Sequence, residues 1–252
     1  MRINNMRKIF LIATIAALAY ACGNDRHPNT DEPLTVISSE QALDGDSTIY
    51  GLACDGCTDS LLIFLPYSGG DPDTIDILEA RLSHKMFGRP RIGDRMAVIL
   101  ASSRDSSVAA MVVNLDELKG RWCYTVMPEF KRRTSGLEGE KKASAPHMPD
   151  SVRKLFMQPR EYGFELKRDY SASPIGLNMR NRNDAQSPVV YPVLKRYHEW
   201  RLFNGQLILT ETRIDTTGNT QITGRDTAQL ILLRHDTLRL RFSSGEQGYY
   251  RH

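Results

Sequence analysis

The stretch KRYHEWRLFNGQLILTETR, residues 195–213, decides the fold. Two runs with many apolar and aromatic residues, Lys195 to Phe203 and Gln206 to Arg213, flank the dipeptide Asn204-Gly205. A type I′ turn needs a positive φ at both central residues, and Asn followed by Gly adopts such angles more readily than other dipeptides. The stretch therefore predicts a β-hairpin with a two-residue turn.

The neighbouring sequence repeats this arrangement. Residues 162–167 alternate between large apolar and small or polar side chains, which is the pattern of a half-buried strand. Thr227 to Leu233 and Leu238 to Phe242 flank a second short turn at His235-Asp236. Successive hairpins form an up-and-down meander, and such a meander avoids exposed edges by curling into a barrel. The region 152–252 thus resembles a lipocalin-type barrel.

The preceding part of the chain also predicts short strands, separated by Asp, Gly, Ser and Pro residues. The runs are Leu34 to Ser38, Thr48 to Cys54, Leu61 to Leu65, Thr74 to Leu78, Met96 to Ala101, Val108 to Asn114 and Trp122 to Met127. A short helix is expected at Glu79 to Phe87, where Leu78, Leu82 and Met86 recur every four residues. So many short strands in so short a region favour a compact barrel, such as the OB type.

These patterns predict an all-β chain with two small antiparallel β-barrel-like domains. An OB-like N-terminal domain is expected at 34–128 and a lipocalin-like meander at 152–252. Residues 129–151 are charged, contain Gly and Pro, and have few large apolar groups, so they form the expected linker. Asp150 is placed to cap a short helix from Ser151 to Met157.

The first 22 residues have the three-part layout of an export signal. Basic residues come first, an uncharged apolar run follows at 9–19, and small residues precede Cys22. This run is about half of the roughly 20 residues that cross a bilayer core, so a retained transmembrane helix is the weaker interpretation. The junction resembles the lipobox of bacterial lipoproteins, which implies acylation of Cys22. The polar residues 23–33 then form a flexible tether.

The charge balance argues against a nucleic-acid partner. The whole chain carries +3, with 33 Lys and Arg against 30 Asp and Glu. Cleavage before Cys22 removes Arg2, Arg7 and Lys8, which leaves 30 basic and 30 acidic residues. A neutral mature chain lacks the electrostatic footprint with which proteins bind polyanions. The expected partner is instead the membrane, through the lipid on Cys22.

Cys54-Asp55-Gly56-Cys57 is the local motif with the clearest chemistry. In thioredoxin-like enzymes such a motif opens a helix, whose N-terminus lowers the pKa of the thiol. Here Gly56 disfavours a helix and an apolar strand follows at Leu61, so the motif is expected in a turn between strands. A structural disulfide is the leading interpretation, and its small loop limits the stabilisation to roughly 2 kcal/mol. The alternatives are a soft-metal site for Cu(I) on the two thiolates and redox signalling through the same pair.

The segment Tyr50 to Cys57, followed by an apolar strand and preceded by a lipobox, is similar to the CxxC lipoproteins of the NlpE type. Those proteins are linked to copper tolerance and envelope-stress sensing in Gram-negative bacteria. The resemblance implies an envelope lipoprotein with a small β-barrel, in which Cys54 and Cys57 form a disulfide or bind copper. It also implies sorting to the outer membrane, because Gly23 rather than Asp follows the lipidated cysteine.

The sequence contains none of the local catalytic motifs HExxH, GxSxG, GxGxxG or a Walker loop. We therefore expect a non-enzymatic, lipid-anchored envelope binding or interaction protein, with a protein or a small ligand as its partner. The alternatives are a copper or thiol-redox sensor that uses Cys54 and Cys57, and a carrier of a small hydrophobic ligand in the C-terminal barrel. Arginines on neighbouring strands of that barrel, among them Arg234, Arg239 and Arg241, are expected on its solvated outer face.

Overall fold

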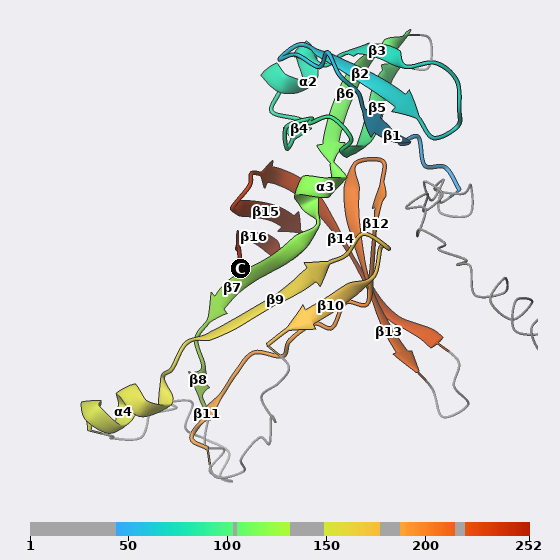
Figure 1. Ribbon diagram of the computed structural model, residues 1–252. Coiled ribbons are helices and arrows are strands. Elements are labelled where there is room, and N and C mark those ends of the chain that lie inside the picture. Colours follow the sequence, from blue (N-terminus) through green and yellow to red (C-terminus); the bar gives the residue numbers. More distant parts are fainter. Residues whose placement is uncertain (1–43, 103–104, 132–148, 177–186, 215–219) are drawn as a thin grey trace, which may run out of the picture. The chain divides into compact units, whose positions relative to one another are not determined.

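A computed structural model of the chain describes residues 44–102, 105–131, 149–176, 187–214 and 220–252. The expected signal at 1–22 with Cys22, the tether at 23–33, the expected strand Leu34 to Ser38 and most of the linker at 129–151 lie outside the described residues. The described part is all-β, as the sequence predicts, and contains two barrel-like sheets (Figure 1). None of its helices is long and apolar enough to span a membrane.

The first sheet has six strands: five form a closed barrel with an OB-like order, and a two-residue strand pairs at its edge. Its elements are β1 (Ile49–Ala53), β2 (Leu61–Pro66), β3 (Asp73–Asp76), α2 (Leu78–Leu82), β4 (Met86–Phe87), β5 (Arg95–Ser102) and β6 (Asp105–Asn114). Neighbouring strands follow the order β3-β2-β1-β5-β6, and a parallel pairing of Asp76 in β3 with Val108 in β6 closes the ring. The helix expected at 79–87 is shorter in the structure, because His84 adopts a left-handed φ of 58° and the chain re-enters the sheet at Met86.

Alternate residues of these strands fill the small barrel. Leu62 and Phe64 of β2 are buried, and so are Met96 and Val98 of β5. Because successive side chains of a strand point to opposite faces, such residues two apart share the inner face. The small barrel is therefore filled mainly by aliphatic side chains from facing strands.

The second sheet is a nearly closed antiparallel barrel of eight strands. The strands are β7 (Gly120–Val126), β9 (Arg160–Leu166), β10 (Ala172–Ile175), β12 (Glu199–Phe203), β13 (Gln206–Ile214), β14 (Thr220–Leu233), β15 (Thr237–Phe242) and β16 (Gly245–Arg251). They follow the order β10-β9-β7-β16-β15-β14-β13-β12, and an isolated bridge between Ser171 and Glu199 links the two edges. The predicted hairpin is confirmed, since Asn204 and Gly205 have φ values of 46° and 75° between β12 and β13. The predicted turn at 235–236 joins β14 to β15.

Short elements complete the described fold: α3 (Leu115–Leu118), β8 (Glu129–Phe130), α4 (Asp150–Phe156) and β11 (Val189–Val190). The strands β8 and β11 pair with each other, and α4 lies where the sequence predicts a helix. The expected cap is wrong, because Asp150 is the first helical residue and Pro149 occupies the N-cap position. β7 lies within the range expected for the first domain, 34–128, yet it pairs with β9 and β16 of the second sheet. The chain therefore changes sheet at α3, ahead of the expected linker.

One apolar core fills the large barrel and extends to the outer face of the small one, whose interior holds a separate cluster. Trp122 and Trp200 are fully buried in it. The indole N–H of Trp122 donates to the Leu118 carbonyl at 2.7 Å, and that of Trp200 donates to the Lys167 carbonyl at 2.9 Å. Residues of β4, β5 and β6 belong to the same cluster, so the two sheets share part of their core.

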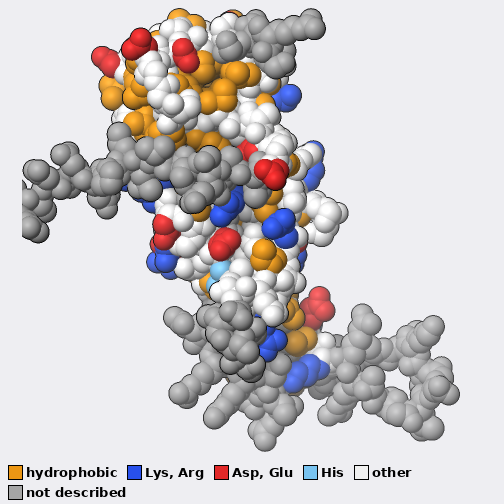
Figure 2. All heavy atoms as spheres, turned by 90° about the vertical axis from the view of Figure 1, so that its right-hand side faces the viewer, with side chains coloured by type: hydrophobic (Ala, Val, Ile, Leu, Met, Phe, Trp, Pro, Cys, Tyr) orange, Lys and Arg blue, Asp and Glu red, His pale blue; other side chains and the backbone are white. Residues whose placement is uncertain are grey.

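The outer face of the large barrel carries paired charges. Arg239 and Arg241 of β15 are exposed and form ion pairs of 3.1 and 2.6 Å with Glu246 of β16. This confirms the expected solvated position of these two arginines. Figure 2 shows one face of the molecule, on which side chains of both charge signs are interspersed and hydrophobic side chains gather over the small barrel at the top.

Candidate functional site

The CxxC motif lies in the turn between β1 and β2, and a strand rather than a helix follows it, as the sequence predicts. Cys54 and Cys57 are half-buried thiols. The Cys57 Sγ donates to the Cys54 carbonyl oxygen at 3.1 Å and lies 3.7 Å from the carbonyl oxygen of Ile63. The disulfide and the redox role expected for this pair stay predictions.

The metal site also stays a prediction. Among the residues that the structure describes, no group of three or more His, Cys, Asp and Glu side chains is assembled to hold a metal ion. Cu(I) prefers soft thiolate ligands, so the copper hypothesis depends on Cys54 and Cys57. The neighbouring carboxylate of Asp55 accepts a hydrogen bond from the Gly56 backbone N–H at 2.8 Å and so belongs to the turn itself.

A cleft of about 960 Å³ opens beside the motif. Its lining comes from the turn at 57–59, from residues 81–91 in α2, β4 and the following loop, from Glu117 of α3, and from residues 231–235 at the end of β14. Cys57 is the residue of the CxxC motif that lines it. The cleft is thus assembled from both sheets and from the helix at which the chain passes from one sheet to the other (Figure 1).

The least exposed side chains of the cleft lining are mainly apolar, and we call them the floor of the cleft. Met86 of β4 and Ile231 and Leu232 of β14 are half-buried. Phe87 and Leu233, beside them, are buried and belong to the shared core. The floor of the cleft is therefore the partly open surface of the core.

Exposed arginines line the cleft beside this apolar floor. Four of them line the cleft, namely Arg81, Arg89, Arg91 and Arg234, and all are exposed. Arg81 forms an ion pair with Asp59, and this hydrogen bond and charge lower the pKa of the exposed Asp59 carboxyl. The guanidinium groups of the other three have no acidic partner within ion-pair distance among the described residues.

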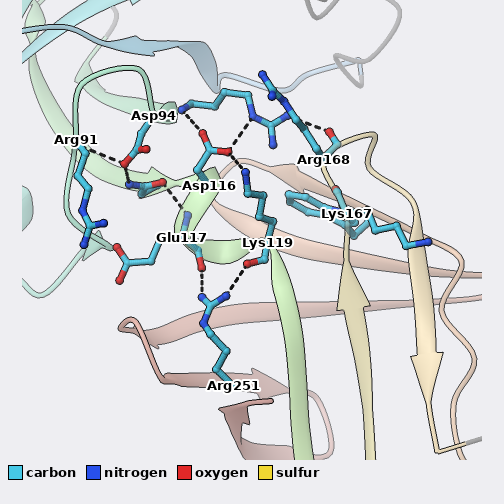
Figure 3. Close-up of polar contacts among 11 residues, drawn as sticks. Arg91, Asp94, Asp116, Glu117, Lys119, Lys167, Arg168 and Arg251 are labelled. Carbon is cyan, nitrogen blue, oxygen red and sulfur yellow. Dashed lines mark hydrogen bonds and ion pairs between the residues drawn. The ribbon is translucent and has the colours of Figure 1, made fainter.

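Two side chains fix the loop that carries Arg89. The Glu117 carboxylate accepts a hydrogen bond from the Arg89 backbone N–H at 2.9 Å, and Asn114 Nδ2 donates to the Arg89 carbonyl at 2.6 Å. Asn114 Nδ2 also donates to the Asp94 carboxylate at 2.6 Å, and its Oδ1 caps α3 by accepting from the Glu117 N–H at 2.9 Å. These contacts hold the loop against α3, and Figure 3 shows Asp94 of the loop beside Glu117 of α3.

Arg251 connects two parts of the cleft lining. Its guanidinium donates to the carbonyl oxygens of Glu117 at 2.5 Å and Lys119 at 2.9 Å (Figure 3). It also donates to the carbonyl oxygen of His235 and lies over the Trp122 ring, with 4.2 Å between its Cζ and the ring centroid. Burial lowers the pKa of the Arg251 guanidinium. One side chain thereby ties α3 to the turn after β14, both of which line the cleft.

A smaller pocket of about 200 Å³ lies on the large barrel and is lined by residues of β7, β9, β15 and β16 and of the segment 193–197, five of them aromatic. At its edge the Tyr197 hydroxyl donates to the Asp226 carboxylate at 2.5 Å, and Lys195 Nζ contacts the same oxygen at 2.5 Å. Burial, together with the hydrogen bond to Asp226, raises the pKa of Tyr197 well above its usual range. Tryptophan and leucine side chains fill the core of the barrel.

Sequence reasoning found the CxxC turn and missed the cleft. The sequence predicts a helix at 79–87 and places Arg234 on an outer face. The local signal is the tripeptide Arg89-Pro90-Arg91, which is a common surface pattern and identifies no site by itself. The cleft could be recognised only when β14 was placed against β4.

Comparisons with known proteins give one similar structure to report. No known protein family and no curated protein matches the chain. Among solved structures, the chain is similar to a lipocalin-like protein from Bacteroides thetaiotaomicron VPI-5482, with 21% sequence identity and a TM-score of 0.28. The match covers 54% of this chain and 96% of that protein.

Proposed function

We propose that this chain is a lipid-anchored, non-enzymatic binding protein of the Gram-negative outer envelope that takes a small ligand in the cleft beside Cys57. The observation that carries the proposal is the cleft. Its volume of about 960 Å³ falls in the range of small-molecule sites, roughly 300–1,000 Å³. Its lining combines an apolar floor with a few converging charged groups, which is the usual composition of such sites.

Binding rather than catalysis is proposed from the chemistry of the lining. The thiol of Cys57 donates its hydrogen bond to a backbone carbonyl and not to a general base. The histidines of the lining, His84 and His235, are exposed, and the arginines are permanent cations. A cationic and apolar lining favours holding a ligand over activating a nucleophile.

The lipid anchor is proposed from the sequence around Cys22. We expect the parent protein to fractionate with membranes and to incorporate labelled fatty acid when it is expressed in a Gram-negative host. The variant Cys22→Ala should lose both properties. Equal labelling and equal membrane association of the two proteins would remove the anchor from the proposal.

The cleft is tested by blocking it. Ile231→Trp places a large ring on the half-buried floor, while Ile222→Trp makes the same change at an exposed position of the same strand. In a thermal-shift screen of fatty acids, phosphorylated sugars and acidic glycans, a ligand present at 100 times its Kd stabilises the folded state by about 2.7 kcal/mol. We expect such a ligand to protect the parent and Ile222→Trp but not Ile231→Trp. Equal protection of all three proteins would place the site elsewhere.

A copper or thiol-redox sensor is the second candidate function. It is favoured by the position of two half-buried thiols in one turn, with Cys57 on the cleft. Titration of Cu(I) into reduced parent protein and into Cys54→Ser tests it, because loss of one thiolate should weaken binding. Equal and weak binding by both proteins would end this candidate.

A carrier of a small hydrophobic ligand is a third candidate, favoured by the aromatic pocket on the large barrel. At about 200 Å³ this pocket is smaller than the sites of drug-sized ligands, so a single aromatic ring is the size that fits. Toluene is a suitable probe, and Ser244→Trp is expected to block the pocket from its exposed edge. Unchanged toluene binding by Ser244→Trp would exclude this pocket.

A further inference from the structure

The charges of the cleft are unbalanced. Its lining contains four arginines against two carboxylates, Asp59 and Glu117, which leaves an excess of two positive charges when its histidines are neutral. Asp59 is neutralised by Arg81, and Glu117 already accepts the backbone N–H of Arg89. Both carboxylates of the lining are therefore bound within the protein, and neither forms an ion pair with the guanidinium groups of Arg89, Arg91 or Arg234.

The unmatched cations come from two separate parts of the chain. Arg89 and Arg91 lie on the loop after β4, and Arg234 lies at the end of β14. By contrast, Arg239 and Arg241, further along the same hairpin, are paired with Glu246. Guanidinium groups bind carboxylate and phosphate through two parallel hydrogen bonds, so an anionic group is the natural counterpart of this rim.

A small anion alone would leave the apolar part of the cleft lining exposed to water. The half-buried Met86, Ile231 and Leu232 leave apolar surface open beside the arginines. Covering such surface stabilises a complex in proportion to the apolar area removed from water. A ligand with both an anionic head and an apolar body matches the two parts of the lining at once.

We infer that the cleft binds a small anionic amphiphile, with its carboxylate or phosphate head at Arg89, Arg91 and Arg234 and its apolar body over Met86, Ile231 and Leu232. The inference rests on the proposed function, because it names the ligand class of the same cleft. It places the ligand between the two barrels and outside the interior of the large one.

Isothermal titration of the full chain with dodecanoate, dodecyl phosphate, 1-dodecanol and inorganic phosphate tests the inference, with each amphiphile kept below its micelle concentration. We expect one or both anionic amphiphiles to bind, and 1-dodecanol and inorganic phosphate to bind at least about tenfold more weakly, since charge-assisted hydrogen bonds and apolar contact are each lost in turn. The stronger of the two anionic probes tells whether carboxylate or phosphate is preferred. Raised salt should weaken its binding.

Variants locate the head group. Arg91→Gln and Arg234→Gln should each weaken binding of the anionic amphiphile by about tenfold. Arg213→Gln changes an exposed arginine of β13 that does not line the cleft, and it should bind as the parent does. All three positions are exposed, so circular dichroism should show an unchanged fold.

Several results would overturn the inference. Binding of 1-dodecanol as tight as that of dodecanoate, with loss of both in Ile231→Trp, would keep the cleft as a binding site and remove its preference for anions. Unchanged binding by Arg91→Gln and Arg234→Gln would show that these arginines do not bind the head group. Binding only to vesicles of phosphatidylglycerol would point to a membrane surface instead. If none of the soluble probes binds the parent, the amphiphile is excluded, while the thermal-shift screen with Ile231→Trp separately decides the proposed function.

Discussion

The two barrels differ in how far strand pairing closes them and in the side chains that fill them. The small barrel is closed by strand pairing all the way round, and aliphatic residues with one phenylalanine fill it. The large barrel is held at its seam by the bridge between Ser171 and Glu199, and its core contains both tryptophans of the chain. The interior of a barrel widens with its number of strands, so the larger one needs larger side chains to fill it. Both rings are therefore closed by backbone pairing, and the two barrels differ in the size of the side chains inside them.

The comparison also shows where the two barrels depend on each other. Residues of β4, β5 and β6 pack into the core of the large barrel, and α3 carries the polar contacts drawn in Figure 3. A core that is shared in this way should make the two barrels unfold together. Substitutions in each barrel and at α3 test whether the stability of one barrel depends on the other.

Trp122→Ala should have the largest effect on stability. It removes a fully buried indole and leaves the Leu118 carbonyl without its 2.7 Å hydrogen bond. We expect the free energy of unfolding to fall by about 3–5 kcal/mol. Urea unfolding can be followed by far-UV circular dichroism, which reports both barrels, and by the fluorescence of Trp200, which reports the large one.

Leu62→Ala in the small barrel is the counterpart of that variant. Its expected cost is about 2–5 kcal/mol, because a fully buried leucine is truncated. If the barrels unfold together, the tryptophan fluorescence transition should shift with the circular dichroism transition in both variants. Separate transitions would show that the barrels fold independently.

Close backbone approaches in the two barrels predict the next largest effect. A Cβ added at Gly51 of the small barrel would lie 2.2 Å from the Leu65 carbonyl oxygen, and one added at Gly163 of the large barrel would lie 1.9 Å from that of Trp122. We expect Gly51→Ala and Gly163→Ala each to destabilise by about 1–3 kcal/mol, since a strand must move to make room. Gly248→Ala is the control, because its Cβ would meet no atom within 4 Å. A thermal melt in which all three variants behave alike would contradict the prediction.

The contacts of Asp116 in α3 predict a pH-dependent effect on stability of similar or smaller size. Burial acts to raise the pKa of Asp116, but hydrogen bonds from the Arg95 backbone N–H and Lys119 Nζ, both at 2.6 Å, and the charges of these residues outweigh it. The pKa of this carboxyl therefore lies below its ordinary value. Its stabilisation is present above the unfolded pKa and is lost as the pH falls through the lower folded pKa.

Asp116→Asn should therefore cost about 1–3 kcal/mol at pH 7, and the difference from the parent should shrink steadily below pH 4. Urea unfolding at several pH values measures it. Asp71→Asn changes an exposed carboxylate of the small barrel and should show no such dependence. A difference between Asp116→Asn and the parent that is constant with pH would show that the lost contact, and not the charge, matters.

The smallest expected effect concerns the CxxC turn. A disulfide between Cys54 and Cys57 closes so small a loop that it stabilises the small barrel by at most about 2 kcal/mol. The melting temperatures of oxidised and dithiothreitol-treated protein measure the difference, and the double variant Cys54→Ser, Cys57→Ser should be insensitive to the reductant. A large reductant-dependent loss of structure would make the turn essential to the fold.

Local sequence predicted the elements more successfully than their partners. Asn204-Gly205 identifies its hairpin because a positive φ at two successive residues is a property of the residues themselves. The membership of β7 was not predictable in the same way, because alternation shows that a strand has a buried face and does not show which sheet covers it. The cleft depends on several such contacts between distant segments. The local sequence around Arg91 and Arg234 therefore does not predict that they line the same cleft.

By itself the sequence determined the all-β class, the position of the main hairpin, the turn that carries Cys54 and Cys57, and the alternating faces of the strands. These features follow from the φ preferences and the polarity of residues close together in the chain. Tertiary structure alone decided that β7 leaves the small barrel, that the two barrels share a core, and that an arginine-rimmed cleft forms between β4 and β14. The physical reason is that side chains distant in sequence meet only when a common apolar core is buried. A local pattern shows that a strand has an apolar face but does not show which other element covers that face.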